Sequence, residues 1–416
     1  MAKIKKIIAR EILDGRGWPT LEVLITAERN LSAKASVPSG SISGNYEAWD
    51  LLDGDMKRYQ GYGVLKAVDK INNIIAPALQ NKAVDNQIAI DNILNDLDST
   101  ANKKDLGANS LLAVSLAAAR LGALNNKQEL FVYLKNVFSL GQASLPQPIF
   151  DIFNGGKYAD TNLDFQEFLL IPKLDSASNM LRMGAEIYHE LGIILREAGY
   201  DTDIGLEGGY APNMDSSLEA LELIMAAALR LKYQPGKDIF LGLDIGSAVL
   251  YQPQEKQYLF SLDHNYFSSA NLIGLYEQWL KKYPLIYLED GLAPDDWSAW
   301  RELTAELGGK IILAGDELFA TNPVRLSQAL KEKAANAVVI KPSQAATLTA
   351  TIDYAKLAQK HHYKLVVSQR GGETNDSFIT DLAVALGAQY LKAGSLSRGE
   401  RIAKYNRLLA IDQLIS

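Results

Sequence analysis

The stretch LIYLEDGLAPDDW, at residues 285–297, begins as an apolar strand and continues into two adjacent acids. Its first four residues are apolar, and Glu289 and Asp290 follow them directly. A carboxylate at the end of a buried strand is costly unless a cation or a hydrogen-bond donor meets it. The stretch therefore predicts a buried strand whose last residues place negative charge next to a cation or a hydrogen-bond donor.

Similar runs recur through the C-terminal two thirds of the chain. They read IFLGLDIG, IILAGDE, AVVIKPS, KLVVSQR and QYLKAGS. With the opening stretch included, their terminal polar residues are Asp244, Glu289, Asp316, Lys341, Gln369 and Lys392. From Glu289 onward these residues stand 23 to 28 positions apart, and helix-like stretches such as NPVRLSQALKEKAAN and TATIDYAKLAQKHHY lie among them. This spacing is typical of strand–loop–helix units.

Units of this length predict an eight-stranded α/β barrel of the TIM type, with a doubly wound open sheet as the alternative architecture. The number of runs favours the barrel, and so does the spread of polar residues over so many strand ends. In a barrel these ends share one rim, where active sites lie.

The first third of the chain has a different pattern. KIKKIIAREIL and TLEVLITAERNLSAKASVP alternate apolar and polar residues, as antiparallel strands do, and GVLKAVDKINNIIAPAL and GANSLLAVSLAAARLGAL follow helical periodicity. We therefore expect an N-terminal α+β domain at 1–138 and a C-terminal barrel at 139–416. The Ser/Gly-rich loop at 37–47 suits a mobile lid, or else an ordinary surface connection.

Composition excludes several classes of protein. The chain has 416 residues, a net charge of −7 and no cysteine, which rules out disulfides, thiolate metal sites and cysteine nucleophiles. The acidic balance argues against a nucleic-acid or membrane partner. The basic N-terminal stretch is interrupted by Arg10 and Glu11 before it reaches signal-peptide length, so we expect a cytoplasmic protein. None of the four histidines stands at a predicted strand end.

Three carboxylates, Asp244, Glu289 and Asp316, end successive predicted strands. Acids gathered at one rim repel one another unless a cation joins them, and oxygen ligands without cysteine suit a hard divalent ion such as Mg²⁺. The alternative is that these acids cap helices or pair with lysines. Asp290 is expected to make a structural hydrogen bond.

Two lysines, Lys341 and Lys392, end two further predicted strands. A lysine beside a bound cation and a second lysine has its charged form disfavoured, so it can act as a base. The alternative is a solvated or salt-bridged lysine.

Three more residues are weaker candidates. Arg370 stands beside two glycines and suits a phosphate or a carboxylate. Glu207 precedes a Gly-Gly turn, where an acid could reach a ligand, and Glu167 opens an apolar strand.

Longer motifs resemble the enolase family. They include VPSGSISGNYEA, LGANSLLAVSLAAA, FNGGKYAD, LEGGYAPN, LEDGLAPDDWSAW, GDELFATNP, SQRGGETNDSFI and LKAGSLSRGERIAKYNRLL. The resemblance implies an N-terminal α+β domain followed by an eight-stranded enolase barrel. It also implies a glycolytic carbon–oxygen lyase that interconverts 2-phosphoglycerate and phosphoenolpyruvate with Mg²⁺, as a homodimer or homo-octamer.

The resemblance also implies a role for each matched position. Lys341 corresponds to the base, Glu207 to the acid and Glu167 to its assistant, while Asp244, Glu289 and Asp316 correspond to metal ligands. The remaining matches, expected to bind the substrate, are Arg370, Lys392, Gln369, Gly371 and Tyr158.

Several positions depart from the family pattern. Ile42 replaces a metal-chelating Ser, Tyr158 and Gln369 each replace a His, and Gly371 replaces a phosphate-contacting Ser. Leu206 replaces the acid before Glu207, and Trp18 an Asn. Each lost partner of a phosphate costs about 1–3 kcal/mol. Two alternatives therefore stay open: an enzyme for another phospho- or phosphono-carboxylate, such as a carboxyphosphonoenolpyruvate synthase, or a non-catalytic binding protein.

Overall fold

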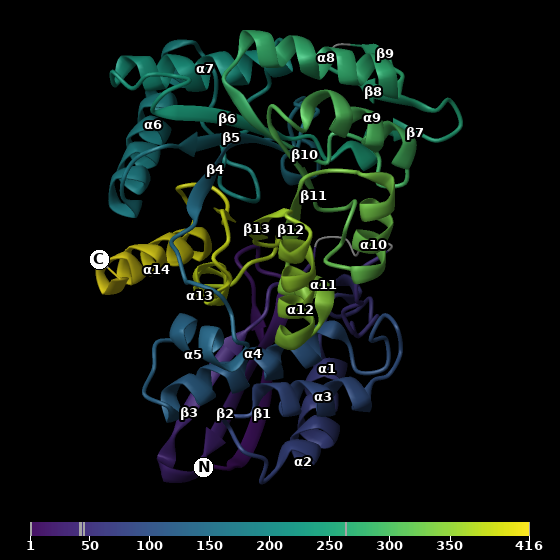
Figure 1. The fold of residues 1–416 in the computed structure, drawn as a ribbon, viewed down its shortest axis with the longest axis vertical. Helices are drawn as coiled ribbons and strands as arrows, with labels where there is room; N and C mark the ends of the chain where they lie inside the picture. The colour runs from purple at the N-terminus through teal and green to yellow at the C-terminus, as the bar shows by residue number, and fades with distance from the viewer. Residues whose placement is uncertain (1, 41–43, 45, 263, 416) are drawn as a thin grey trace.

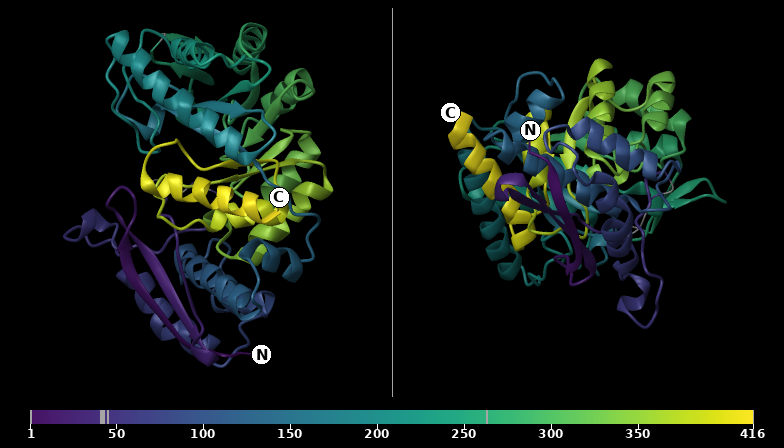
Figure 2. Two further views of the ribbon diagram at one scale, coloured as in Figure 1. Left: turned by 90° about the vertical axis from the view of Figure 1, so that its left-hand side faces the viewer. Right: turned by 90° about the horizontal axis from the view of Figure 1, so that it is seen from below.

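The computed structural model describes residues 2–40, 44, 46–262 and 264–415, and the predicted change at Ile42 lies outside them. The chain forms an N-terminal domain and a larger barrel, which lie at opposite ends of the long axis (Figure 1). The left-hand view of Figure 2, turned by 90° about the vertical axis, shows the same separation. No helix of the described residues is both long and apolar enough to cross a membrane.

The N-terminal domain is a three-stranded antiparallel sheet covered by helices. Its strands are β1 (Ile4–Leu13), β2 (Pro19–Ala27) and β3 (Ser32–Ser36). Alternate β2 side chains such as Leu21, Val23 and Ile25 are buried, and α4 packs on β2 and β3. The helical elements are α1 (Leu65–Lys70), η3 (Ile71–Ile75), α2 (Ala76–Leu79), α3 (Gln87–Leu97), α4 (Ala108–Asn125) and α5 (Leu130–Val137), with short turns η1 (Glu28–Asn30) and η2 (Tyr59–Gly61). The predicted strands and helices of this domain are thus confirmed.

The second domain is a closed eight-stranded barrel with strand order β10-β11-β12-β13-β14-β4-β5-β6. Its strands are β4 (Gln147–Asn154), β5 (Glu167–Pro172), β6 (Ile239–Asp244), β10 (Leu285–Glu289), β11 (Ile312–Gly315), β12 (Ala337–Ile340), β13 (Lys364–Ser368) and β14 (Tyr390–Lys392). Every predicted apolar run is one of these strands, so the barrel is confirmed and the open sheet is excluded. Side chains such as Ile149, Leu169, Tyr287 and Val339 fill its interior as a separate apolar cluster.

One barrel strand runs against the others. β5 pairs antiparallel with both β4 and β6, whereas the remaining neighbours are parallel. Glu167, the first residue of β5, therefore lies beside Asn154 and Asp244, the last residues of β4 and β6. This topology explains how an acid at the start of a strand reaches the rim formed by the ends of its neighbours.

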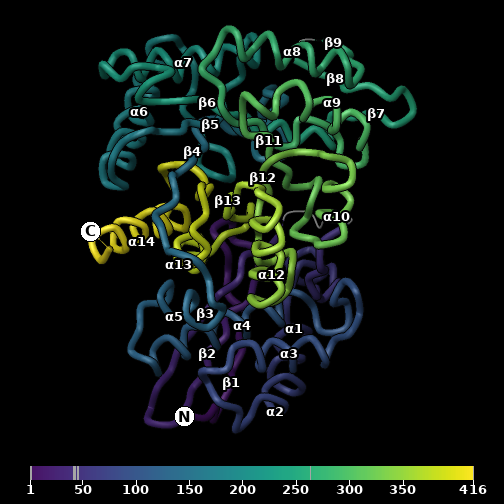
Figure 3. The backbone as a smooth tube through the Cα atoms, in the orientation of Figure 1, coloured from purple at the N-terminus to yellow at the C-terminus, as the bar shows by residue number. Residues whose placement is uncertain are grey.

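Helices cover the outside of the barrel. They are α6 (Ala177–Glu197), α7 (Ser217–Arg230), α8 (Ser269–Lys282), α9 (Trp297–Leu307), α10 (Pro323–Glu332), α11 (Pro342–Ala345), α12 (Leu348–Lys360), α13 (Phe378–Leu386) and α14 (Gly399–Ile415). Shorter elements are η4 (Gly156–Tyr158), η5 (Ser247–Val249), β7 (Tyr251–Gln252), β8 (Gln257–Phe260) and β9 (Asn265–Phe267). Side chains of Ser176, Ser216 and Thr347 accept N-cap hydrogen bonds at α6, α7 and α12. Figure 3 shows the link from α5 to β4 passing α13, where the Ser144 N–H donates to the Val384 carbonyl at 3.3 Å.

A buried carboxylate joins the two domains. Asp91 of α3 accepts hydrogen bonds from the backbone N–H and hydroxyl of Thr349 on α12, at 2.8 and 2.6 Å. Within its own domain it accepts from Ser115 at 2.6 Å and from Gln87 at 3.0 Å. Because the carboxylate is fully buried, these bonds replace all of its hydration.

Asp91→Ala should lower the free energy of unfolding by about 3 kcal/mol, because it removes the buried hydrogen bonds to Ser115 and Gln87 and leaves the partly buried Thr349 N–H without its acceptor. Urea unfolding followed by circular dichroism measures this loss. The exposed Asp105→Ala is the control and should change stability by less than about 0.5 kcal/mol. Equal unfolding midpoints for the two variants would contradict this account.

Candidate functional site

A cavity of about 280 Å³ opens at the barrel rim, between the barrel and the 37–47 loop. Five of the predicted site residues line it: Asp316, Lys341, Arg370, Gly371 and Tyr158. The loop contributes Gly44, Tyr46 and Glu47 to the opposite wall. The described part of the loop thus packs over the rim, and its role as a mobile lid stays a prediction.

The innermost cation of the site is Lys392, whose side chain is 2% exposed. Its ammonium Nζ lies 2.9 Å from Asp244 Oδ2 and 2.8 Å from Glu289 Oε1, and both contacts are hydrogen bonds. Glu167 Oε2 lies 3.0 Å away as an ion pair. Lys392 is therefore the protein cation that meets Glu289, which agrees with the alternative that the acids pair with lysines.

Lys341, at the end of β12, forms a second ion pair with Asp316. Gln344 also donates to Asp316, at 3.3 Å. Although burial acts to lower the pKa of Lys341, the Asp316 carboxylate raises it overall. In this arrangement Asp316 holds the ammonium and favours its charged form, whereas the expectation of a lysine with a disfavoured charge concerns a site with a bound cation and stays a prediction.

Asp290 has the structural role that the sequence predicts. Its carboxylate accepts from the backbone N–H groups of Asp316 at 3.0 Å and Glu317 at 2.8 Å. The bonds fix the turn after β11 and so place the Asp316 side chain at the rim.

The three predicted metal ligands outnumber the two lysines that pair with them. They come from adjacent strand ends, since Asp244 pairs with Glu289 in the β6–β10 register and Asp316 follows the neighbouring β11. Burial raises the pKa of Asp244 well above its usual range, and Glu289 adds to the rise despite the contact with Lys392. Such a set of hard oxygen donors fits a divalent cation.

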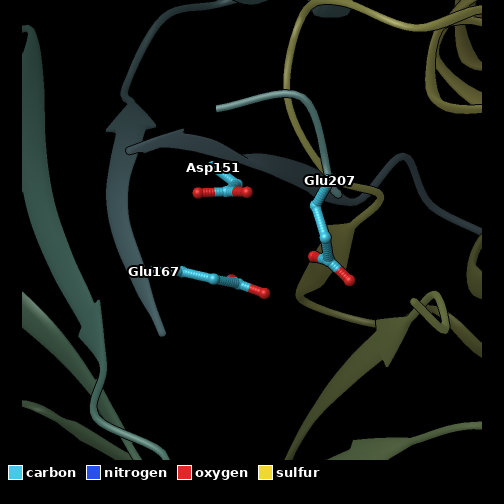
Figure 4. Close-up of side chains that lie close together, drawn as sticks. All are labelled: Asp151, Glu167 and Glu207. Atoms are coloured by element: carbon cyan, nitrogen blue, oxygen red, sulfur yellow. The ribbon is translucent and has the colours of Figure 1, made fainter. Parts of the chain in front are cut away.

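The most compact acidic cluster, however, is a different one. In the part of the chain that the structure describes, the group whose carboxylate oxygens lie within 4.8 Å of one another is Asp151, Glu167 and Glu207 (Figure 4). Burial raises the pKa of Glu167 well above its usual range, and Glu207 and Asp151 contribute, although Lys392 opposes them. Asp151 was not predicted as a site residue. PIFDIF nevertheless resembles the opening stretch, because it places an acid in an apolar run.

Glu207 is oriented by amides. The Gln369 side-chain amide donates to its carboxylate, and Arg401 donates to the other end of Gln369. The side-chain Oδ1 of Asn154 accepts from the backbone N–H of Glu207 at 3.2 Å, while the Asn154 side-chain NH₂ donates to Asp151. Arg401 also donates to the Gly371 carbonyl at 2.7 Å, so Gln369 and Gly371 are both fixed by one buried guanidinium.

Arg370 is held by Glu47 of the 37–47 loop. Its guanidinium forms a bidentate pair with Glu47, at 2.6 and 3.1 Å, and both side chains are largely buried. Backbone hydrogen bonds of 2.8 and 3.1 Å join Ser39 to Gly372 next to this pair. Glu47 could not be predicted as the partner from the sequence, because charge alone does not pick one acid from many.

The remaining departures lie around the cavity. Burial raises the pKa of Tyr158 well above its usual range, and its backbone carbonyl accepts from the Leu206 N–H at 2.8 Å. Trp18 lies outside the site and makes an edge contact with Tyr62, with ring centroids 5.2 Å apart. All four histidines are exposed, in line with their having no assigned chemistry.

Comparisons with known proteins agree with this architecture. One family model, described as "Enolase, N-terminal domain", matches residues 4–134, and another, "Enolase, C-terminal TIM barrel domain", matches residues 142–416. The chain is also 44% identical over 415 residues to an enolase of Bdellovibrio bacteriovorus, an alignment that covers 99% of this chain and 96% of the relative. These findings confirm both the resemblance seen in the sequence and the expected fold class.

Lys392→Met should lower the free energy of unfolding by about 3–5 kcal/mol near pH 8, because it leaves buried carboxylates without their cation. The pKa values of Asp244 and Glu167 are already raised by burial, and loss of the ammonium raises them further. An acid whose folded pKa exceeds its unfolded value favours folding once it is protonated, so the loss should shrink as the pH falls to about 5.

Urea unfolding across this pH range, with a chelator present, measures the effect. The exposed Lys331→Met is the matched control. A loss of stability that stays constant with pH would show that packing, not charge, is the main contribution of Lys392.

Proposed function

The chain belongs to the enolase family, and we propose that it is a magnesium-dependent lyase that interconverts 2-phosphoglycerate and phosphoenolpyruvate with loss of water. The observation that carries this proposal is that a candidate base and a candidate acid lie around one barrel rim. Lys341, the proposed base, lines the cavity, and Glu207, the proposed acid, belongs to a cluster of buried carboxylates that contacts Lys392 through Glu167. The cytoplasmic location and the homodimer or homo-octamer remain predictions.

The reaction needs both a base and positive charge in this site. A proton on the carbon next to a carboxylate is scarcely acidic, because its removal builds a doubly charged enolate that positive charge must stabilise as it forms. Lys341 is the proposed base, and it must release Asp316 and its own proton before it can act. Mg²⁺ held by Asp244, Glu289 and Asp316 would supply charge that stabilises the enolate.

The other side chains bind and orient the substrate in this proposal. Lys392 would contact the substrate carboxylate, and Arg370 would exchange the Glu47 carboxylate for the phosphate. Glu207, assisted by Glu167, would protonate the departing hydroxyl. The hydroxyl then leaves as water, and the electron pair of the enolate forms the new double bond.

A second candidate is supported by the residues that line the cavity. Tyr158 and Gly371 stand there in place of the family's His and Ser, so the phosphate surroundings differ in shape and in hydrogen-bond donors. A related phospho- or phosphono-carboxylate that also passes through an enolate would use the same base and acid. A non-catalytic binding protein has no such supporting observation, since buried charges of this number are costly to keep.

Purified protein with Mg²⁺ and 2-phosphoglycerate should give an enol product that ultraviolet absorbance detects, and a chelator should abolish the signal. Heat measurements of Mg²⁺ binding to the wild type and to Asp316→Asn should show weaker binding in the variant. Mg²⁺ binding without turnover would select the second candidate, and the absence of both would refute the enzyme.

Lys341→Ala should slow exchange of the substrate's α-proton with solvent by about 10²–10⁴-fold, because no other group takes over the role of base. Exchange into deuterated water, followed by proton nuclear magnetic resonance, measures this step separately from dehydration. Lys331→Ala, an exposed lysine on α10, is the control. Unchanged exchange in Lys341→Ala would remove Lys341 from the role of base.

A further inference from the structure

Asp151 lies in the middle of β4 with no exposed surface. Its Oδ2 accepts from the Asn154 amide, whereas its Oδ1 is buried and has no hydrogen-bond partner among the described residues. Figure 4 shows the three carboxyl groups of Asp151, Glu167 and Glu207 gathered around one space, and their oxygens come within 4.8 Å of one another. An orphaned buried oxygen next to two other acids needs a proton or a cation.

The cations nearby are engaged elsewhere. Lys392 contacts Glu167 together with Asp244 and Glu289, and Arg401 donates to Gln369 and to backbone carbonyls. The other titratable groups that face Asp151 are the phenols of Tyr188 and Tyr405. Burial raises the pKa of Asp151 well above its usual range, and the charge of Glu207 raises it further.

The neighbours of Glu207 limit where a proton can be held. Gln369 and Asn154, which hydrogen-bond to its side chain and backbone, are amides and do not titrate near neutral pH. Glu167 has Lys392 as an ion-pair partner at 3.0 Å, although burial raises its pKa well above its usual range. Of the two acids that share this cluster with Glu207 in the described structure, Asp151 is the one without an ion-paired cation.

We propose that Asp151 is a positioning residue whose carboxyl group shares one proton with that of Glu207. This inference rests on the proposed function and deepens it. Glu207 gives its proton to the hydroxyl that leaves as water, and becomes a carboxylate. Solvent water then returns one proton to the Asp151–Glu207 pair, while the α-proton remains on Lys341 until it too exchanges with solvent.

Asp151→Asn keeps the shape of the side chain and removes the second carboxyl group. Because the cluster then has one carboxyl group fewer, it holds its proton less firmly. The alkaline limb of the kcat profile should therefore move to lower pH by about one unit or more, while α-proton exchange catalysed by Lys341 stays within about twofold of the wild type. The buried Asp381→Asn, which lies outside the site, controls for general destabilisation.

A second readout does not depend on turnover. Infrared spectra of the resting protein at neutral pH should contain carbonyl bands of protonated carboxyl groups, and the difference spectrum between the wild type and Asp151→Asn should show the loss of one such band. Should that variant fail to fold, Glu207→Gln should weaken the same band, because its amide would donate to Asp151 and favour the ionised form.

The outcomes separate the two proposals. Absence of turnover in the wild type with the band present refutes the proposed function and leaves the shared proton supported. A band that persists in both variants, or an unmoved pH profile, overturns the role of Asp151. The role of Asp151 is also overturned if the wild type lacks the band and binds a divalent ion only when Asp151 is present. The cluster would then be a cation site.

Discussion

The contact of the Lys392 ammonium with three buried carboxylates is the interaction on which the rest of the site depends. Glu167, Asp244 and Glu289 come from β5, β6 and β10, which are adjacent in the closed barrel. Each charge would be very costly if buried alone, and the group is tolerated because every member has a partner. The same contact holds the predicted metal ligands and the acid cluster at fixed positions relative to one another.

The reversed direction of β5 gives this arrangement its geometry. In a barrel with all strands parallel, an acid at the start of a strand would lie at the rim opposite to the strand ends. Because β5 is antiparallel to both neighbours, Glu167 instead lies in register with Asp244. The acidic rim is therefore a consequence of chain topology as well as of residue type, and the two cannot be separated by changing one side chain.

Much of the fold could be predicted because its signals are local. Each barrel strand from β10 onward is a short apolar run closed by a polar residue, and that pattern needs only a few neighbouring positions. The partners of those polar residues could not be predicted in this way. The Glu47–Arg370 pair joins positions 323 residues apart, and the choice between a metal and Lys392 opposite Glu289 depends on distances that no spacing in the sequence encodes.

The departures from the family pattern are unevenly distributed, and this distribution has a physical meaning. Lys341, Asp316 and the turn fixed by Asp290 are all retained at the base end. At the acid end, Gln369 and Leu206 replace residues that titrate, and Asp151 and Glu167 lie beside Glu207. The retained residues are those that the proposed reaction uses to form the enolate. The changed ones lie near the group proposed to expel the leaving group, which is where a change of substrate would act first.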